Sequence, residues 1–143
     1  MAYRQDLSNS ARRHLRAADE LCGLTSGGAQ PGCKAVAGYL FGLSGELAIK
    51  AMMRDSGMKP LTADRRRDDP FYAHFPELKL RLLAILEGRR SGELRIIAET
   101  KALFQNWDTD MRYAPTADID NAWIESWKTA RTIWSIGWIR SDG

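Results

Sequence analysis

The sequence contains few of the residues that bind metals or form cross-links. Its 143 residues include only two cysteines and two histidines. A structural zinc site needs four ligands, so it would require every one of these side chains, and the spacing of Cys22 and Cys33 fits no metal motif. We therefore expect no metal site and two free thiols, as is typical of the reducing cytoplasm.

Long apolar runs and cofactor-binding loops are also missing. The most apolar stretch, residues 37–53, is interrupted by Glu46, Lys50 and three glycines, so we do not expect it to span a membrane. The first ten residues lack the basic and apolar segments of a secretory signal. There is no phosphate-binding Walker loop, Gly-rich dinucleotide turn or paired metal-ligand His. These absences predict a cytoplasmic protein without a cofactor.

No segment shows the alternation of a strand, whereas apolar residues recur at helical spacing along the chain. Gly57 and Pro60 end the most apolar segment, and Pro76 suits the first turn of a helix. The predicted helices cover about Ser8 or Ser10 to Leu24, Lys34 to Asp55, residues 75–88, residues 91–107, and about Ile119 to Ile139. This pattern predicts an all-α, up-and-down bundle of four or five helices, with residues 1–143 as a single domain.

The charge of the chain is mildly basic. A net charge of +3 and a pI near 9.0 permit contact with nucleic acid without requiring it. Arg12 and Arg16 share one face of the first helix, which fits either phosphate binding or a charged outer face. The run RRRDD, residues 65–69, lies in a long predicted loop, and we interpret it as solvated and partly self-neutralised.

The last predicted helix carries tryptophans close to whole helical turns apart. They are Trp123, Trp127, Trp134 and Trp138. Such a stripe is typical of packing in a core or a dimer interface. The alternative is a platform on which nucleic-acid bases stack, and few basic residues interleave with the rings to support it.

The apolar second helix raises two questions. Its glycines at 38, 42 and 45 predict that a neighbouring helix, a partner subunit or a ligand approaches its backbone closely. Glu46 and Lys50 are spaced for an ion pair one turn apart, either on a narrow polar strip or in a polar cluster inside the bundle or at an interface. Arg112 and Tyr113, in the turn before the last helix, are candidates for that cluster.

Three segments together resemble the HEPN superfamily, the higher eukaryotes and prokaryotes nucleotide-binding domains. They are ARRHLRAADEL, AGYLFGLSGELAIKAMM with its acidic residue and following Lys, and NWDTDMRYAP ahead of the final helix. The segment HFPEL also resembles the His-containing entry to the third helix of that family. The resemblance spans nearly the whole chain and depends on the order and spacing of these segments.

The resemblance implies a homodimer of all-α domains with a polar cleft at the interface. It would place Glu46 and Lys50 in that cleft facing Arg112 and Tyr113, with Glu46 holding the Arg112 guanidinium. Many members are metal-independent ribonucleases that use an Arg and a His with four to six residues between them. Arg112 matches the Arg by position, but no His follows it.

A second pair, Arg67 and His74, does have the ribonuclease spacing. It lies in a loop interrupted by a proline, ahead of the third helix, and we interpret it as a chance match.

These observations lead to three hypotheses. The first is a non-catalytic or degenerate HEPN-like dimer that binds RNA, a nucleotide or a protein partner, in a toxin–antitoxin or defence system with a nucleotidyltransferase partner. The second is an active metal-independent ribonuclease that uses Arg112 with His74 as catalytic residues. The third is a structural helical module that only binds a neighbouring protein. Under the first, Arg112→Ala weakens binding at a site formed by Glu46, Lys50, Arg112 and Tyr113.

Overall fold

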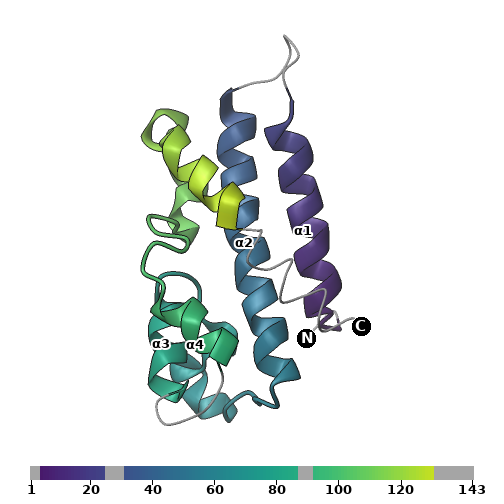
Figure 1. The fold of residues 1–143 in the computed structure, drawn as a ribbon, viewed down its shortest axis with the longest axis vertical. Helices are drawn as coiled ribbons and strands as arrows, with labels where there is room; N and C mark the ends of the chain where they lie inside the picture. The colour runs from purple at the N-terminus through teal and green to yellow at the C-terminus, as the bar shows by residue number, and fades with distance from the viewer. Residues whose placement is uncertain (1–3, 25–30, 87–91, 131–143) are drawn as a thin grey trace.

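A computed structural model describes residues 4–24, 31–86 and 92–130. Every regular element within these ranges is a helix, which confirms the predicted all-α bundle (Figure 1). Four α-helices, labelled α1 to α4, and a further helical segment at residues 121–130 form its frame. None of the described helices is both long and apolar enough to cross a membrane.

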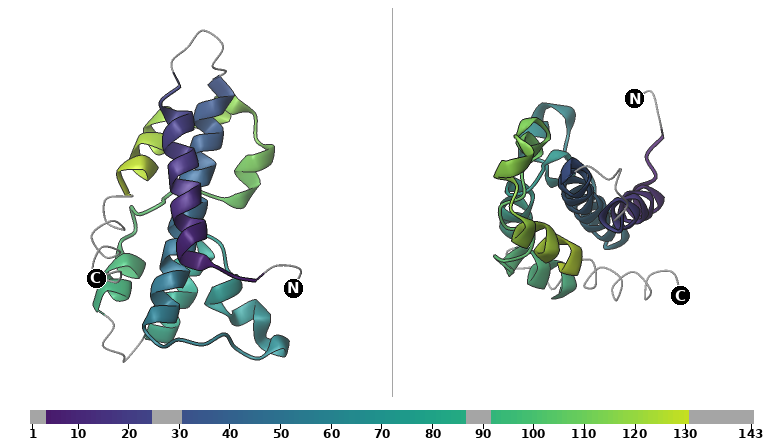
Figure 2. Two further views of the ribbon diagram at one scale, coloured as in Figure 1. Left: turned by 90° about the vertical axis from the view of Figure 1, so that its right-hand side faces the viewer. Right: turned by 90° about the horizontal axis from the view of Figure 1, so that it is seen from above.

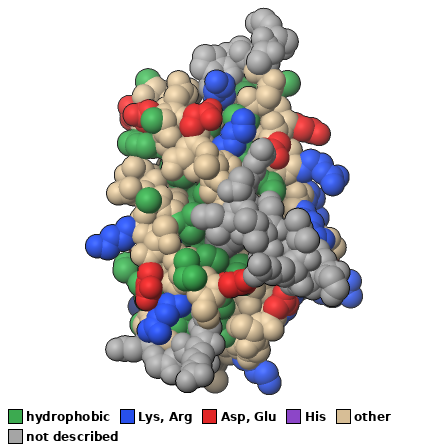
Figure 3. Space-filling model, in the orientation of Figure 1, with side chains coloured by type: hydrophobic (Ala, Val, Ile, Leu, Met, Phe, Trp, Pro, Cys, Tyr) green, Lys and Arg blue, Asp and Glu red, His purple; other side chains and the backbone are tan. Residues whose placement is uncertain are grey.

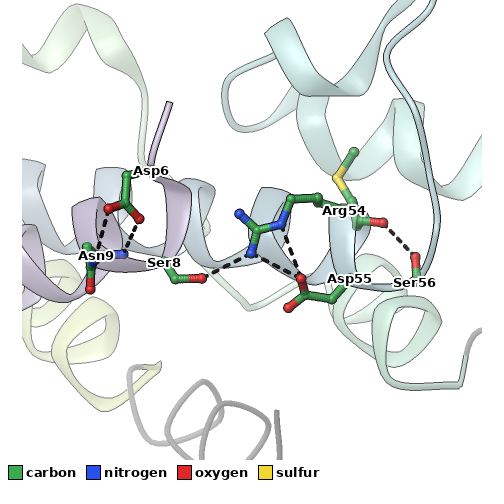
Figure 4. A network of polar contacts seen from close by, with 7 residues as sticks. Asp6, Ser8, Asn9, Arg54, Asp55 and Ser56 are labelled. Carbon is green, nitrogen blue, oxygen red and sulfur yellow. Dashed lines mark hydrogen bonds and ion pairs between the residues drawn. The ribbon is translucent and has the colours of Figure 1, made fainter. Parts of the chain in front are cut away.

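The first two helices form an antiparallel pair. Helix α1 covers Leu7–Cys22 and α2 covers Pro31–Asp55, so α2 begins three residues earlier than predicted. The Ser44 hydroxyl donates a hydrogen bond of 2.8 Å to the carbonyl oxygen of Ala11 and joins the two helices near their middle. Where α1 begins and α2 ends, the Arg54 guanidinium donates a hydrogen bond to the Ser8 hydroxyl (Figure 4).

The N-terminus of α1 is capped by an acidic residue that precedes the predicted start at Ser8 or Ser10. Asp6 accepts hydrogen bonds from both the backbone and the side-chain nitrogens of Asn9, at 3.3 and 2.8 Å (Figure 4). A carboxylate is a good cap because it satisfies an open amide and interacts favourably with the helix dipole. The cap explains why the helix begins at Leu7, before either serine.

Helix α2 lies between α1 and the rest of the bundle (Figure 2). The other side of α2 faces α3 (Glu77–Leu86), α4 (Gly92–Glu99) and the helical segment at 121–130. Core side chains from all of these elements meet around α2. The largest fully buried ones are Trp107, Trp127, Phe41, Ile49, Met53, Leu78, Leu82 and Leu86. Because α2 is enclosed on two sides, nearly all of its middle is apolar.

Helix α4 ends at Glu99, whereas the sequence predicts a helix through residue 107. Residues 100–107 form turns instead, with Phe104 and Asn106 in the left-handed region at φ 54° and 69°. The Lys79 ammonium donates to the carbonyl oxygens of Thr100 at 2.8 Å and Leu103 at 2.7 Å. These charge-assisted bonds satisfy carbonyls that a longer helix would have paired, and so stabilise the turn.

Aromatic rings of the same chain pack directly against the glycines of α2. A Cβ atom at Gly42 would lie 2.0 Å from the Trp107 ring, and one at Gly45 would lie 2.5 Å from the Phe104 ring. Gly38 is similarly close to Trp127, at 2.9 Å. Of the alternatives that the sequence left open, the close approach is therefore made by rings of this chain, from turn 100–107 and segment 121–130.

The tryptophan stripe can be followed only in part. Trp127 is 1 % exposed and donates from its indole nitrogen to the Gln105 carbonyl oxygen at 3.0 Å, so it belongs to the core. Trp123 packs at the edge of the core and is partly buried. Trp134 and Trp138, with the predicted helix end at Ile139, lie outside the described residues.

Four short 3₁₀ helices replace two of the predicted loops. Ala63–Asp68 (η1) and Pro70–Tyr72 (η2) connect α2 to α3, while Thr109–Tyr113 (η3) and Thr116–Asp118 (η4) precede the helical segment at 121–130. The elements η1 and η2, the residues leading into α3, and η3 form the groove described next.

Candidate functional site

Glu46 is a buried carboxylate with a defined set of partners. Glu46 lies near the middle of α2, and only 2 % of the residue is exposed to solvent. One oxygen, Oε1, accepts from the backbone nitrogen of Phe75 at 2.8 Å, and the other, Oε2, lies 2.9 Å from Nδ1 of His74. Burying a charged group is costly without such bonds, so the contacts fix the chain at the entry to α3. Glu46 is therefore buried against the entry to α3 and does not lie on an exposed polar strip.

The contact with Glu46 orients the His74 ring. An ionised carboxylate only accepts hydrogen bonds, so Nδ1 of His74 carries the shared proton. The free nitrogen of the ring is then Nε2, which accepts a proton when the ring is neutral and donates one when it is charged. The His74 side chain is 55 % exposed, and it lines a groove together with residues of η1, η2 and η3. His74 therefore presents a nitrogen suited to acid–base chemistry, held in place by a buried acid.

The groove beside His74 has a volume of about 830 Å³. Its lining combines basic, acidic and aromatic side chains: Asp64, Arg66, Arg67, Tyr72, His74, Phe75, Glu77, Arg81, Asp108 and Asp110. The Arg66 guanidinium lies over the Tyr72 ring, 4.5 Å from its centroid. Arg81 is paired with Glu77 at 3.1 Å. One wall of the groove, from η1 and η2, carries Arg66, Arg67 and Tyr72 together with the carboxylate of Asp64, and we call it the basic wall; the other, at the start of η3, is acidic.

The basic wall is held by a second buried carboxylate. Asp69 is 1 % exposed, and it accepts from the backbone nitrogens of Leu61 at 2.8 Å and Phe71 at 3.0 Å. These two bonds close the loop that carries the arginines. The prediction of a solvated charge run is therefore wrong for Asp69, although residues 65–68 are exposed.

Lys50 is the third buried charge behind the groove. It is 8 % exposed, one helical turn after Glu46. Burial lowers the pKa of the Lys50 ammonium, while attraction to Glu46 and Asp69 acts in the opposite direction. A buried ammonium of this kind depends on nearby carboxylates to remain charged. The surroundings of Lys50 thus disfavour its charged form in spite of the two carboxylates.

Within one chain, Arg112 and Tyr113 have partners other than Glu46, and the contact expected across a dimer interface stays a prediction. The Arg112 Nε atom donates to the Thr109 carbonyl oxygen at 3.1 Å, and its guanidinium lies 5.0 Å from the centroid of the exposed Tyr113 ring. Arg112 lines a separate cavity with Tyr39 of α2. Tyr39 and Glu46 are seven residues apart, or about 10 Å along a helix. Within one chain, the oxygens of Glu46 bond to the entry of α3 instead.

The proposed catalytic pair, Arg112 and His74, is likewise not brought together within the chain. The two residues line different cavities, of about 470 and 830 Å³. By contrast, Arg67 and His74 line the same groove. The sequence shows their spacing, but the proline between them favours a chance match. Pro70 begins the short helix η2, which turns the chain and places both residues on one groove.

A second basic surface follows the outer face of α1. Arg12, Arg13 and Arg16 line a shallow depression of about 550 Å³ with Asn9 and Glu20. Figure 3 shows Lys and Arg side chains along the edge of the molecule where α1 runs. The depression has no histidine in its lining and no buried charge, so it offers less chemistry than the His74 groove.

Both cysteines are free and partly buried at the facing ends of α1 and α2. In the described part of the chain, no three His, Cys, Asp or Glu side chains gather closely enough to hold a metal ion. What the His74 groove offers is therefore an oriented imidazole, guanidinium groups and an aromatic ring. No family model, curated protein or solved structure matches the chain.

Proposed function

We propose that this chain is a HEPN-like protein that binds RNA in the His74 groove. The observation that carries the proposal is the position of His74, which Glu46 holds at the side of a groove that also contains Arg66 and Arg67. Guanidinium groups bind phosphate with paired hydrogen bonds, and an aromatic ring can stack on an unpaired base. These are the two kinds of contact that a single-stranded RNA requires.

The mixed charge of the groove is compatible with an RNA ligand. The acidic side chains Asp108 and Asp110 belong to the η3 wall, whereas Arg66 and Arg67 belong to η1. A phosphate backbone is repelled by the acidic wall and attracted by the basic one. The backbone would therefore follow η1, and the bases would lie toward Tyr72 and the acidic wall.

Fluorescence anisotropy with a short, labelled, single-stranded RNA of mixed sequence tests the proposal. Arg67→Ala should weaken binding about tenfold, or about 1.4 kcal/mol, if it contacts a phosphate. Arg95→Ala is the matched control, because Arg95 lies on α4, outside the groove, and pairs with Glu99. Equal affinities of wild type and Arg67→Ala would reject the groove as the RNA site. If Arg16→Ala loses RNA binding and Arg67→Ala does not, the RNA-binding site lies on α1.

A second candidate function is metal-independent cleavage of RNA, favoured by the Nδ1 contact between His74 and Glu46. Nε2 of His74 would remove the proton of a ribose 2′-hydroxyl, whose oxygen then attacks the adjacent phosphorus; the bond from phosphorus to the 5′-oxygen breaks, and that oxygen takes up a proton from water. Arg67 would supply the guanidinium from the same chain. A catalytic pair of His74 with Arg112, as in the second hypothesis from the sequence, would require Arg112 to come from a second copy of the chain.

Cleavage can be separated from binding by the choice of substrate. RNA incubated with the protein and a chelator should yield 2′,3′-cyclic phosphate ends, and the same sequence made of 2′-deoxynucleotides should remain intact. His74→Ala should abolish the activity while retaining RNA affinity. Absence of cleavage by the wild type, together with RNA binding, would favour the non-catalytic function.

A homodimer and a nucleotidyltransferase partner belong to the proposal on the basis of the HEPN resemblance alone. Sedimentation equilibrium of the purified chain tests the first, and co-purification with the product of a neighbouring gene tests the second. If the chain is monomeric, the polar cleft between two copies does not form, and the RNA site must lie within one chain. Co-purification with a protein and no RNA binding would instead favour the structural helical module.

A further inference from the structure

The seam between α1 and α2 is lined by small, buried residues. Ala11 and Ala18 of α1 and Ala37 of α2 have no exposed surface, and Ser44 of α2 is buried as well. The hydrogen bond of 2.8 Å from the Ser44 hydroxyl to the Ala11 carbonyl oxygen shows that the two helices meet there directly. This bond also fixes the register of the pair, because it places Ala11 and Ser44 on facing sides at the same level.

The two cysteines continue this seam toward the end of α1 and the beginning of α2. Cys22 lies eleven residues after Ala11, and Cys33 lies eleven residues before Ser44. Eleven residues make about three turns of an α-helix, so each cysteine returns to the side that faces the other helix. Because the helices are antiparallel, both steps run about 16 Å in the same direction. Cys22 and Cys33 therefore lie at one level across the seam.

Helices that pack through small side chains are close enough for a disulfide between facing positions. Their axes are about 8–10 Å apart and each Cα atom stands about 2.3 Å from its axis, which leaves about 4–6 Å between facing Cα atoms. A disulfide joins Cα atoms about 4.4–6.8 Å apart. A shared cavity supports this proximity, because Leu21, the neighbour of Cys22, lines it together with Cys33. Both thiols are free and only partly buried, so a small oxidant can reach them.

We propose that Cys22 and Cys33 form an oxidation site, at which oxidised glutathione converts the two thiols into a disulfide between α1 and α2. The thiolate of one cysteine attacks a sulfur of the glutathione disulfide, forms a mixed disulfide and releases one glutathione thiol. The thiolate of the other cysteine attacks the protein sulfur of that mixed disulfide and releases the second glutathione thiol. The two cysteines thus lose two electrons and two protons, and the two glutathione thiols gain them.

The inference is independent of RNA binding, since α2 separates this seam from the His74 groove (Figure 2). In a reducing compartment such a bond is a transient response to oxidation and not a permanent cross-link. The site therefore adds a reversible covalent link between α1 and α2 to a chain whose cysteines are otherwise free thiols.

Equilibration of the full chain with reduced and oxidised glutathione, under native conditions and in urea, tests the inference. Residues 17–33 contain no Lys or Arg, so trypsin releases both cysteines in one peptide, residues 17–34. An internal disulfide lowers the mass of that peptide by two hydrogen atoms, whereas a mixed disulfide or a link between two chains raises it. The folded chain should favour the internal disulfide at least about tenfold more than the unfolded chain, because folding brings the thiols together.

A matched control moves one thiol off the seam and keeps the number of cysteines. The double variant Cys22→Ser, Glu20→Cys places it on the exposed outer face of α1. This variant should lose the preference of the folded chain and accumulate mixed disulfides with glutathione. As a second measurement, the oxidised wild type should melt at least about 5 °C above the reduced chain.

Three results would overturn the inference. The first is a wild type that forms the internal disulfide no more readily when folded than in urea. The second is a double variant that forms its internal disulfide as readily as the wild type. The third is a link between two chains as the main product of the folded protein.

Discussion

Trp107 and Gly42 are in direct contact, and the indole ring occupies the space that a side chain at position 42 would need. A Cβ atom there would lie 2.0 Å from both Cε2 and Nε1 of the ring. The same indole nitrogen donates to the carbonyl oxygens of Gly38 and Tyr39, each at 3.2 Å. Turn 100–107 is therefore fixed to the middle of α2 by both packing and hydrogen bonds.

Gly42→Ala should destabilise the protein by about 3 kcal/mol, because a buried ring and the backbone of α2 must separate to admit the methyl group. Urea unfolding followed by circular dichroism measures the free energy of unfolding. Gly92→Ala is the control, since no atom lies within 4 Å of a Cβ there, at the exposed start of α4. That variant should be neutral or slightly stabilising. Equal stability of the two variants would mean that Trp107 does not lie on Gly42.

Lys79→Met should cost about 2 kcal/mol of stability, because the carbonyl oxygens of Thr100 and Leu103 lose charge-assisted hydrogen bonds. The same urea experiment applies, with the exposed Lys101→Met as the control for the loss of charge. The tryptophan fluorescence of Lys79→Met should also change, since turn 100–107 carries Trp107. A stability equal to that of Lys101→Met would contradict a role for Lys79 in holding the turn.

The buried ammonium of Lys50 predicts an alkaline pH dependence. Burial lowers the pKa of Lys50 in the folded chain below its ordinary value of 10.5. Between these two values the unfolded chain binds more protons, so the contribution of Lys50 to the free energy of unfolding increases as the pH rises. Below the lowered pKa both states are protonated, and the contribution is constant.

This dependence is measured as the difference in stability between wild type and Lys50→Met at a series of pH values. The wild type should gain relative to the variant as the pH approaches 10.5. The pKa of Lys79 is also lowered by burial, but Lys79 is present in both proteins and cancels in the difference. A difference that stays flat, or that falls with pH, would show that Lys50 is not desolvated.

Salt dependence distinguishes the His74 groove from the site expected around Arg112. If Arg67 neutralises one phosphate, Arg67→Ala should reduce the slope of log affinity against log salt concentration by about 0.7, the value for one contact with a single strand. Arg112→Ala should leave the slope unchanged, because Arg112 lines a different cavity. The opposite result would place the RNA near Tyr113 and restore the original expectation.

Helical periodicity predicted the fold well and the helix ends less well. The end of α2 at Asp55 and the beginning of α3 next to Pro76 were correct, because Gly57 and Pro76 act locally on the backbone. The end of α4 at Glu99 was missed, because residues 100–107 have a helical pattern of apolar residues. Their conformation is determined by contacts with Lys79 and with the glycines of α2, which lie far away in the sequence.

The candidate site could be predicted only in part, because its contacts join residues far apart in the chain. The isolation of Glu46 and Lys50 among apolar residues left open whether they form an exposed pair or a buried cluster, and the structure buries both. Their partners could not be chosen from the sequence, since the bond from Glu46 to His74 spans 28 residues and no local pattern marks it. Asp69 was missed because a carboxylate in a run of charges looks solvated, although its bonds to the backbone bury it.

The position of α1 has a practical consequence for experiments on this protein. Within the described residues, α1 packs mainly against α2, and α2 separates it from the groove (Figure 2). A fluorophore or surface tether attached through the outer face of α1, for example at position 17 or 20, would lie on the other side of α2 from the His74 groove. Ligand titrations could then be read from an immobilised or dye-conjugated chain without obstructing the approach to His74.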